Sequence, residues 1–177
     1  MKMLKKLLAV VLTGAMALTL FTACGSNAVR DKDIADALNN IVKLNDSEVT
    51  FTPRAKEREM AQKVAALLES HSEDDSNSAE LSAKIQGILG IDQGGVNENN
   101  FVWVQNALTD KLGAEGQAFQ VMESLTDKGG AYNFSSLGSK EPAYTRYMGT
   151  ALCKIPDQKD NLVTVRVIVV TAKAEDE

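Results

Sequence analysis

The chain has 177 residues, of which 19 are basic and 24 acidic, and its net charge at pH 7 is −5. An acidic chain has no general electrostatic attraction for nucleic acid, so we expect no nucleic-acid partner. Two cysteines and one histidine, His71, supply none of the tight His or Cys pairs typical of zinc sites. We therefore expect no metal and no cofactor, and a fold stabilised by packing.

The N-terminal segment has the composition of a secretory signal peptide. A head with three lysines precedes an apolar run over residues 7–20, which is too short to span a membrane comfortably. The segment ends in Phe21-Thr22-Ala23-Cys24, which resembles the lipobox of bacterial lipoproteins. The resemblance implies cleavage before Cys24, a diacylglyceryl thioether on its sulfur and a further acyl group, such as palmitate, on its new amine. The alternative is an ordinary signal peptide cut elsewhere, which leaves Cys24 free to pair.

These features divide the chain into a lipoprotein signal peptide over 1–23, a lipidated tether over 24–30 and one globular domain over 31–177. Two or three acyl chains hold a protein on a membrane stably, at about 0.8 kcal/mol for each buried CH₂ group. We therefore expect the protein on the extracytoplasmic face of the cell membrane, with Cys24 as its anchor.

Helical spacing of apolar residues predicts helices over about 31–43, 53–70, 77–89, 101–112 and 119–125. In the second of these helices, Thr52 and Pro53 are predicted as the N-cap and the first helical position, and the charged residues at 54 and 56–59 as the solvated side. Gly90 is expected to end the third helix. Between the first two helices, residues 47–52 alternate in polarity and predict a short strand or an extended link.

Two polar segments are predicted as loops. The acidic stretch over 70–78 lacks the spacing of an EF-hand, so a solvated loop is favoured over a calcium site. The segment over 127–142 is rich in Gly and Ser, and an irregular segment of that length is typically functional or mobile.

The C-terminal part predicts a β-hairpin. Residues 143–155 and 162–172 flank Pro-Asp-Gln-Lys-Asp-Asn, which has turn chemistry. The second strand carries apolar residues on both faces, interrupted by Thr164 and Arg166, so it is predicted to be central and covered by helices. The expected fold is α+β, with several helices packed on an antiparallel sheet built around this hairpin. Cys153, in the first strand, is interpreted as an inert buried thiol.

Several motifs together resemble the CAP (SCP-like) superfamily of secreted proteins. The predicted second helix ends near His71-Ser72, where that family commonly has a His-Ser pair. Glu98-Asn99 is similar to the end of the family's Gly-Glu-Asn motif, and Gly149 and Ala151 match its Gly-x-Ala-like strand. The resemblance implies an α/β/α sandwich with a cavity that often holds two histidines and two acids. Since the chain has no second histidine, the resemblance implies a degenerate pocket here.

Three functions follow from these observations. The absence of a catalytic constellation favours a lipid-anchored module of the bacterial envelope that binds a protein, peptide or small ligand without catalysis. The alternative is a CAP-like hydrolase that uses His71 and Glu98 across a cleft closed by the 127–142 loop. The third hypothesis is assembly, in which the edge of the C-terminal hairpin pairs with another chain.

Overall fold

The computed structural model describes residues 29–45, 47–70, 78–91, 100–109, 112–126, 142–157 and 159–174. The helices in these ranges are α2 (Asp31–Leu44), α3 (Ala55–Ser70), α4 (Ser78–Leu89) and α5 (Ala114–Thr126). The strands are β1 (Thr50–Pro53), β2 (Asn100–Leu108), β3 (Pro142–Pro156) and β4 (Leu162–Ala174). The fold is therefore α+β, as the sequence predicted.

The described strands form one sheet in the order β1-β3-β4-β2. The C-terminal strands β3 and β4 make the predicted antiparallel hairpin, and β2 pairs antiparallel with the other side of β4. The sheet is mixed, however, because β1 runs parallel to β3, with Phe51 beside Arg146. The sequence predicted an antiparallel sheet because nothing in a four-residue strand indicates the direction of its partner.

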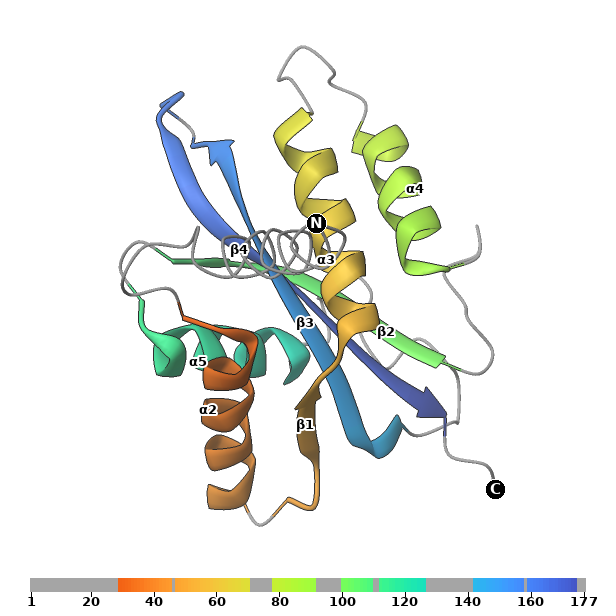
Figure 1. Cartoon of the computed structure of the whole chain (residues 1–177), viewed down its shortest axis with the longest axis vertical. Coiled ribbons are helices and arrows are strands. Elements are labelled where there is room, and N and C mark those ends of the chain that lie inside the picture. The colour runs from red at the N-terminus through yellow and green to blue at the C-terminus, as the bar shows by residue number, and fades with distance from the viewer. Residues whose placement is uncertain are drawn as a thin grey trace, which may run out of the picture.

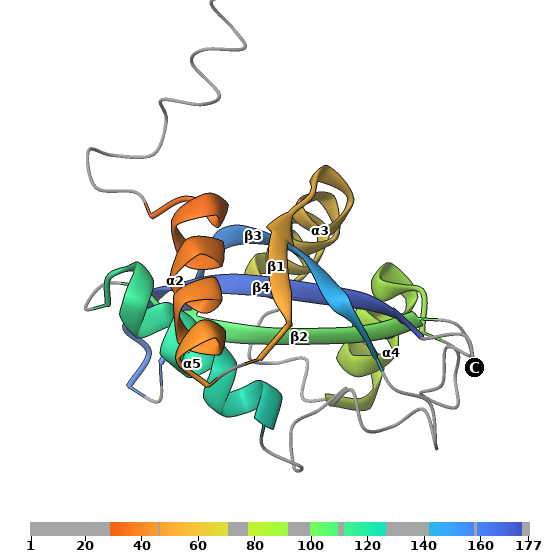
Figure 2. The same cartoon turned by 90° about the horizontal axis from the view of Figure 1, so that it is seen from below.

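Of the described helices, α2 and α5 lie on one face of the sheet and α3 and α4 on the other (Figures 1 and 2). Side chains of β4 alternate between the two cores: Ile168 and Val170 pack towards α2 and α5, and Val167 and Val169 towards α3 and α4. The strand is central and buried on both faces, which confirms the prediction from its apolar pattern.

The helix predicted over 101–112 is wrong, because Asn100–Leu108 is strand β2. Phe101 and Trp103 lie in the core beneath α2 and α5, whereas Val102 and Val104 face the opposite core. A strand with apolar residues on both faces also places apolar residues three and four apart, so periodicity alone does not separate it from a helix. Trp103 is nevertheless a core residue, with 1% of its surface exposed.

The helices α2, α3 and α4 lie close to their predicted ranges, with one correction at the start of α3, whereas α5 begins at Ala114, five residues before its predicted range. Pro53 is the last residue of β1, beside Met148, and is not the first residue of the helix. The N–H of Arg54 continues this pairing by donating to the carbonyl of Met148, and the helix begins at Ala55. Gly90 ends α4 with a φ of +70°, a conformation that glycine adopts at low cost.

The interior of α5 also differs from its prediction. Phe119 was placed on the apolar stripe, but 64% of its surface is exposed, and Ala118 and Val121 are the buried residues. Met122 and Leu125, the other residues of the predicted stripe, are partly buried against the same core as Ala118 and Val121. Among the described helices, none is long and apolar enough to cross a membrane.

Candidate functional site

The predicted site residues Cys24, His71 and Glu98 lie outside the residues that the structure describes. The same holds for residues 127–141 of the loop that was predicted over 127–142 to close a cleft, whereas Pro142 begins β3. Cys153 does lie in a described strand, where it is buried as expected. In the described ranges, no group of three or more His, Cys, Asp or Glu side chains is placed to hold a metal ion.

The most concentrated polar chemistry in the described residues lies where α2 and α3 begin. Two carboxylates, Asp31 and Glu57, are buried in the first turns of these helices. A negative charge is favoured there by the positive end of the helix dipole. Each carboxylate organises a cluster of hydrogen bonds, which we call the Asp31 cluster and the Glu57 cluster. They lie on opposite faces of the sheet.

The Glu57 cluster joins α3 to the central strand β4. Arg54 donates to both carboxylate oxygens of Glu57, from Nε at 2.6 Å and from Nη2. The hydroxyl of Thr171 donates to Oε1 at 2.7 Å. The guanidinium of Arg54 also stacks on Tyr147, with 3.8 Å between Cζ and the ring centroid. The side chain of Glu57 is fully buried, so its prediction as part of a solvated face is wrong.

These contacts determine the ionisation of Glu57. Burial by itself raises the pKa of the Glu57 carboxyl, but hydrogen bonds from Arg54, from Thr171 and from its own backbone N–H outweigh this effect. The pKa of Glu57 therefore lies below its ordinary value, and the side chain is charged at neutral pH. Since its oxygens already accept these bonds, it is poorly placed to accept a substrate proton.

The Asp31 cluster joins five elements, α2, α3, α5, β3 and β4. Thr150 of β3 donates its hydroxyl to Asp31 Oδ1, and Arg58 of α3 donates from Nε to Oδ2 at 2.6 Å. Arg166 of β4 donates to the Thr150 hydroxyl at 2.9 Å and to Gln117 of α5 at 3.0 Å. Except for Arg58, each of these side chains is less than one tenth exposed. Buried polar groups that all find partners fix the relative positions of the elements that carry them.

A close contact between backbones brings the two clusters together. The strand β1 ends beside Met148, and the start of α3 then crosses β3 at Gly149. A Cβ atom added at Gly149 would lie 1.9 Å from the backbone nitrogen of Arg58, so only glycine allows this approach. As a result Glu57 lies over β4, while the side chain of Arg58 reaches Asp31 on α2.

Taken together, the two clusters act as a framework. Arginine and threonine side chains bind both carboxylates, and these hydrogen bonds connect helices to strands. Asp31 and Glu57 are thus suited to fixing the three layers, because their oxygens are already engaged by these bonds.

One of these residues had a signal in the sequence. Arg166 interrupts the most apolar strand of the chain, and a charge in a buried strand requires a partner. Glu57 had no such signal, because it lies in a run of charged residues that resembles a solvated helix face. Only the crossing at Gly149 turns Glu57 inward.

No family model, curated protein or solved structure matches this chain. The function must therefore be inferred from the residues of the chain itself.

Proposed function

We propose that this protein is a lipid-anchored module on the extracytoplasmic face of a bacterial envelope, where it binds a protein, peptide or small ligand without catalysis. The observation that carries the proposal is the leader that ends in Phe21-Thr22-Ala23-Cys24. Acylation of Cys24 would attach the chain to the membrane, because each buried CH₂ group contributes about 0.8 kcal/mol.

The position of α2 in the chain supports an interaction close to the membrane. Helix α2 begins at Asp31, seven residues after Cys24. Even a fully extended chain spans at most about 3.5 Å per residue, so the tether reaches about 25 Å. A domain held at this distance meets partners in the envelope near the membrane surface, and partners further away must come to it.

The buried charges support a binding role over a catalytic one. Asp31 and Glu57, the buried carboxylates of the described residues, are both bound by arginine side chains of the framework. Their role in joining the layers leaves the described surface as the part available for recognition.

The anchor is tested by expressing the full chain in a bacterial host and measuring its mass and its partition between membrane and soluble fractions. We expect a membrane-bound product that lacks residues 1–23 and carries acyl groups on Cys24. Cys24→Ala is expected to abolish acylation and membrane retention, whereas the matched variant Cys153→Ala retains both. A wild-type protein that is cleaved at another bond and recovered without lipid contradicts the proposal.

The second candidate is a CAP-like hydrolase that uses His71 and Glu98. It is favoured by part of the order of the described elements: α2, the short strand β1, α3 and the C-terminal hairpin follow one another in three layers, as the resemblance implies. The strand β2 departs from that order, which was drawn with a helix at this position. In sequence, His71 directly follows α3, and Glu98 precedes β2 by two residues. A survey of ester and peptide substrates tests it. Turnover that His71→Ala and Glu98→Gln each abolish would establish this activity and overturn the non-catalytic proposal.

A further inference from the structure

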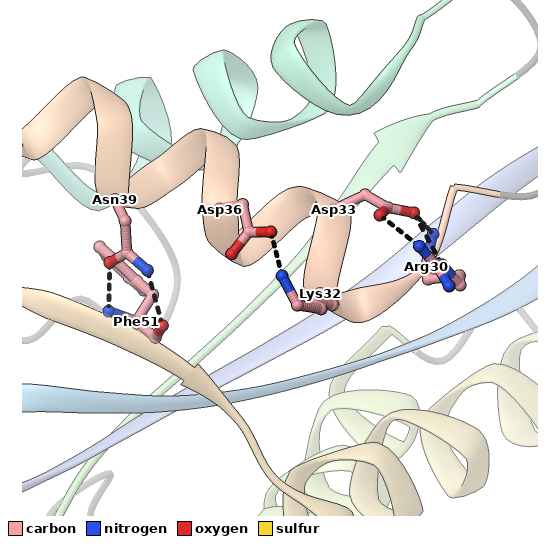
Figure 3. Close-up of polar contacts among 6 residues, drawn as sticks. All are labelled: Arg30, Lys32, Asp33, Asp36, Asn39 and Phe51. Carbon is pink, nitrogen blue, oxygen red and sulfur yellow. Dashed lines mark hydrogen bonds and ion pairs between the residues drawn. The ribbon is translucent and has the colours of Figure 1, made fainter.

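The two edges of the described sheet differ in how they are protected against pairing with another chain. The edge formed by β1 and β3 is closed in several ways. The side-chain amide of Asn39 in α2 forms hydrogen bonds with both backbone groups of Phe51 (Figure 3). It donates to the carbonyl at 3.0 Å and accepts from the N–H at 2.7 Å. Further along, Glu69 accepts a hydrogen bond from the backbone N–H of Lys154. β3 also has a proline at each end and an irregular register near Pro142. Such features prevent edge-to-edge association.

The opposite edge, formed by β2, has none of these features (Figure 2). Asn100–Leu108 contains no charged residue, no proline and no glycine, and its register with β4 is continuous from end to end. A long, regular and uncharged edge strand is a template for pairing with another strand.

The hydrogen bonding of β4 shows which groups of β2 point outward. The N–H of Thr109 donates to the carbonyl of Thr164, which lies opposite it where the register of β2 and β4 continues. Odd-numbered residues of β2 therefore form their hydrogen bonds with even-numbered residues of β4. Because directions alternate along a strand, Val102, Val104, Asn106 and Leu108 direct their N–H and C=O groups away from the sheet. No residue in the described ranges bonds to these groups.

The side chains of the same residues favour an apolar partner. Val102 and Val104 lie on the α3/α4 face and are only partly buried, and 50% of the surface of Leu108 is exposed. A strand added beside β2 would cover these side chains and pair the outward backbone groups at the same time.

From these observations we infer that β2 pairs antiparallel with β2 of a second copy of this chain, about a two-fold axis at Gln105. In this register Val102 faces Leu108 of the partner subunit, and Val104 faces Asn106 of the partner subunit. All four outward residues of each copy then find hydrogen-bonding partners, and each Leu108 packs against a valine. The paired strands are identical and uncharged, so two acidic molecules meet where neither carries a charge.

The symmetry also suits two anchored molecules. A two-fold axis that extends a sheet in its own plane is normal to that sheet, so it keeps the α2/α5 faces of both copies on the same side. In each copy α2, through which the chain enters the domain, lies on that face of the sheet (Figure 2). Both chains would therefore enter from the same side of the eight-stranded sheet that the pairing forms. This orientation is compatible with one membrane, a point that rests on the proposed lipid anchor; the pairing of the strands does not depend on it.

The pairing is tested by disulfide cross-linking in solution. Every described element lies after residue 28, so a chain of residues 25–177 retains the described fold. In a Cys153→Ala background, Gln105→Cys is expected to form a covalent dimer on mild oxidation. Opposite residues in such a pair have Cα atoms about 4.5 Å apart, within the range for a disulfide. The control Asn106→Cys is expected to cross-link poorly, since the two copies of residue 106 are offset by about 8 Å.

Light scattering with size-exclusion chromatography tests the same interface without a cross-link. We expect the 25–177 chain to have the mass of a dimer and Val104→Pro or Asn106→Lys to have that of a monomer. Residue 104 points its N–H outward, so proline removes no bond to β4. Leu152→Lys, on the closed edge, is expected to remain dimeric. Circular dichroism of each variant shows whether the monomers are folded.

A monomer at all concentrations overturns this proposal, whatever the membrane fractionation shows about Cys24. A dimer that persists in folded Asn106→Lys and does not cross-link through Gln105→Cys also overturns it, because its interface then lies elsewhere.

Discussion

Glu57 shows what the burial of a charged side chain requires. Its carboxylate leaves water completely, and Arg54 and Thr171 replace the lost hydration with charge-assisted and hydroxyl hydrogen bonds. Arg54 in turn stays partly exposed and stacks on Tyr147, so its own charge remains solvated. The cluster is therefore stable only as long as Glu57 is ionised.

Replacing Glu57 with glutamine tests this requirement. We expect Glu57→Gln to lower the free energy of unfolding by about 2 kcal/mol near neutral pH, because hydrogen bonds to the charged form are lost. The pKa of Glu57 is lowered in the folded state from an ordinary value of 4.5. The stabilisation is thus complete above this value and lost as the pH falls through the folded pKa.

The measurement is urea unfolding of wild type and variant at several pH values between about 3 and 7. The difference between them should shrink as the medium becomes acidic. Glu59→Gln, in an exposed ion pair with Lys63, is the matched control and should have a much smaller effect. A difference that does not change with pH contradicts the assignment.

Cys153 gives a second prediction at this scale. Burial, with a smaller contribution from Glu69, raises the pKa of the Cys153 thiol to about 11. At pH 8 only about one thiol in a thousand is then ionised, and the thiolate is the reactive form. We expect the folded 25–177 chain to react with an aromatic disulfide reagent far more slowly than the same chain in denaturant. Equal rates would show that Cys153 is accessible.

At the scale of the elements, local patterns predicted most of the fold. The helices α2, α3 and α4 lie near their predicted positions, because their apolar spacing and end signals act over a few residues, and α5 contains its predicted range but begins five residues earlier. The hairpin of β3 and β4 is local in the same sense. The strand β2 was mistaken for a helix because its apolar residues fit a helical and a strand periodicity equally well. Pairing with β4, which is distant in the sequence, decides for the strand.

The close approach of α3 to β3 at Gly149 predicts that a methyl group added at this residue destabilises the fold. Gly149→Ala would place Cβ 1.9 Å from the backbone nitrogen of Arg58, and backbone cannot move aside as a side chain can. We expect a loss of about 3 kcal/mol or more in the free energy of unfolding, measured by urea denaturation.

Gly87, in α4, is the matched control, since nothing lies within 4 Å of a Cβ added there. Gly87→Ala should stabilise the protein by about 0.5–1 kcal/mol, because alanine is the better helix former. If both substitutions have the same effect, the close approach of α3 to Gly149 is not what holds these elements together.

At the scale of the whole molecule, the two cores share the sheet. Neighbouring residues of β4, Val169 and Val170, belong to different cores, and the pair of Arg58 with Asp31 joins α3 to α2. One core cannot lose its packing without exposing the strand on which the other packs. The described layers should therefore unfold as one unit.

Two probes test this cooperativity. Trp103, the single tryptophan, reports on the α2/α5 core by fluorescence, and circular dichroism reports on helices of both layers. We expect the two urea transitions to coincide. Val167→Ala and Val170→Ala, on opposite faces of β4, should each cost about 2 kcal/mol and shift both probes equally. Separate midpoints would mean that the cores unfold independently.

The sequence by itself determined the class of the fold, most of its helices, the C-terminal hairpin and the central place of β4. It also predicted a lipid anchor at Cys24. Each of these depends on residues that are close in the chain, where spacing, end signals and turn chemistry act directly.

Only the tertiary structure decided the direction of β1, the strand character of β2 and the burial of Glu57. These depend on residues that the fold brings together from distant parts of the chain: Phe51 with Arg146, β2 with β4, and Glu57 with Thr171. A local sequence pattern indicates how a segment can bury its apolar side chains. It does not indicate which distant segment of the chain will pack against them.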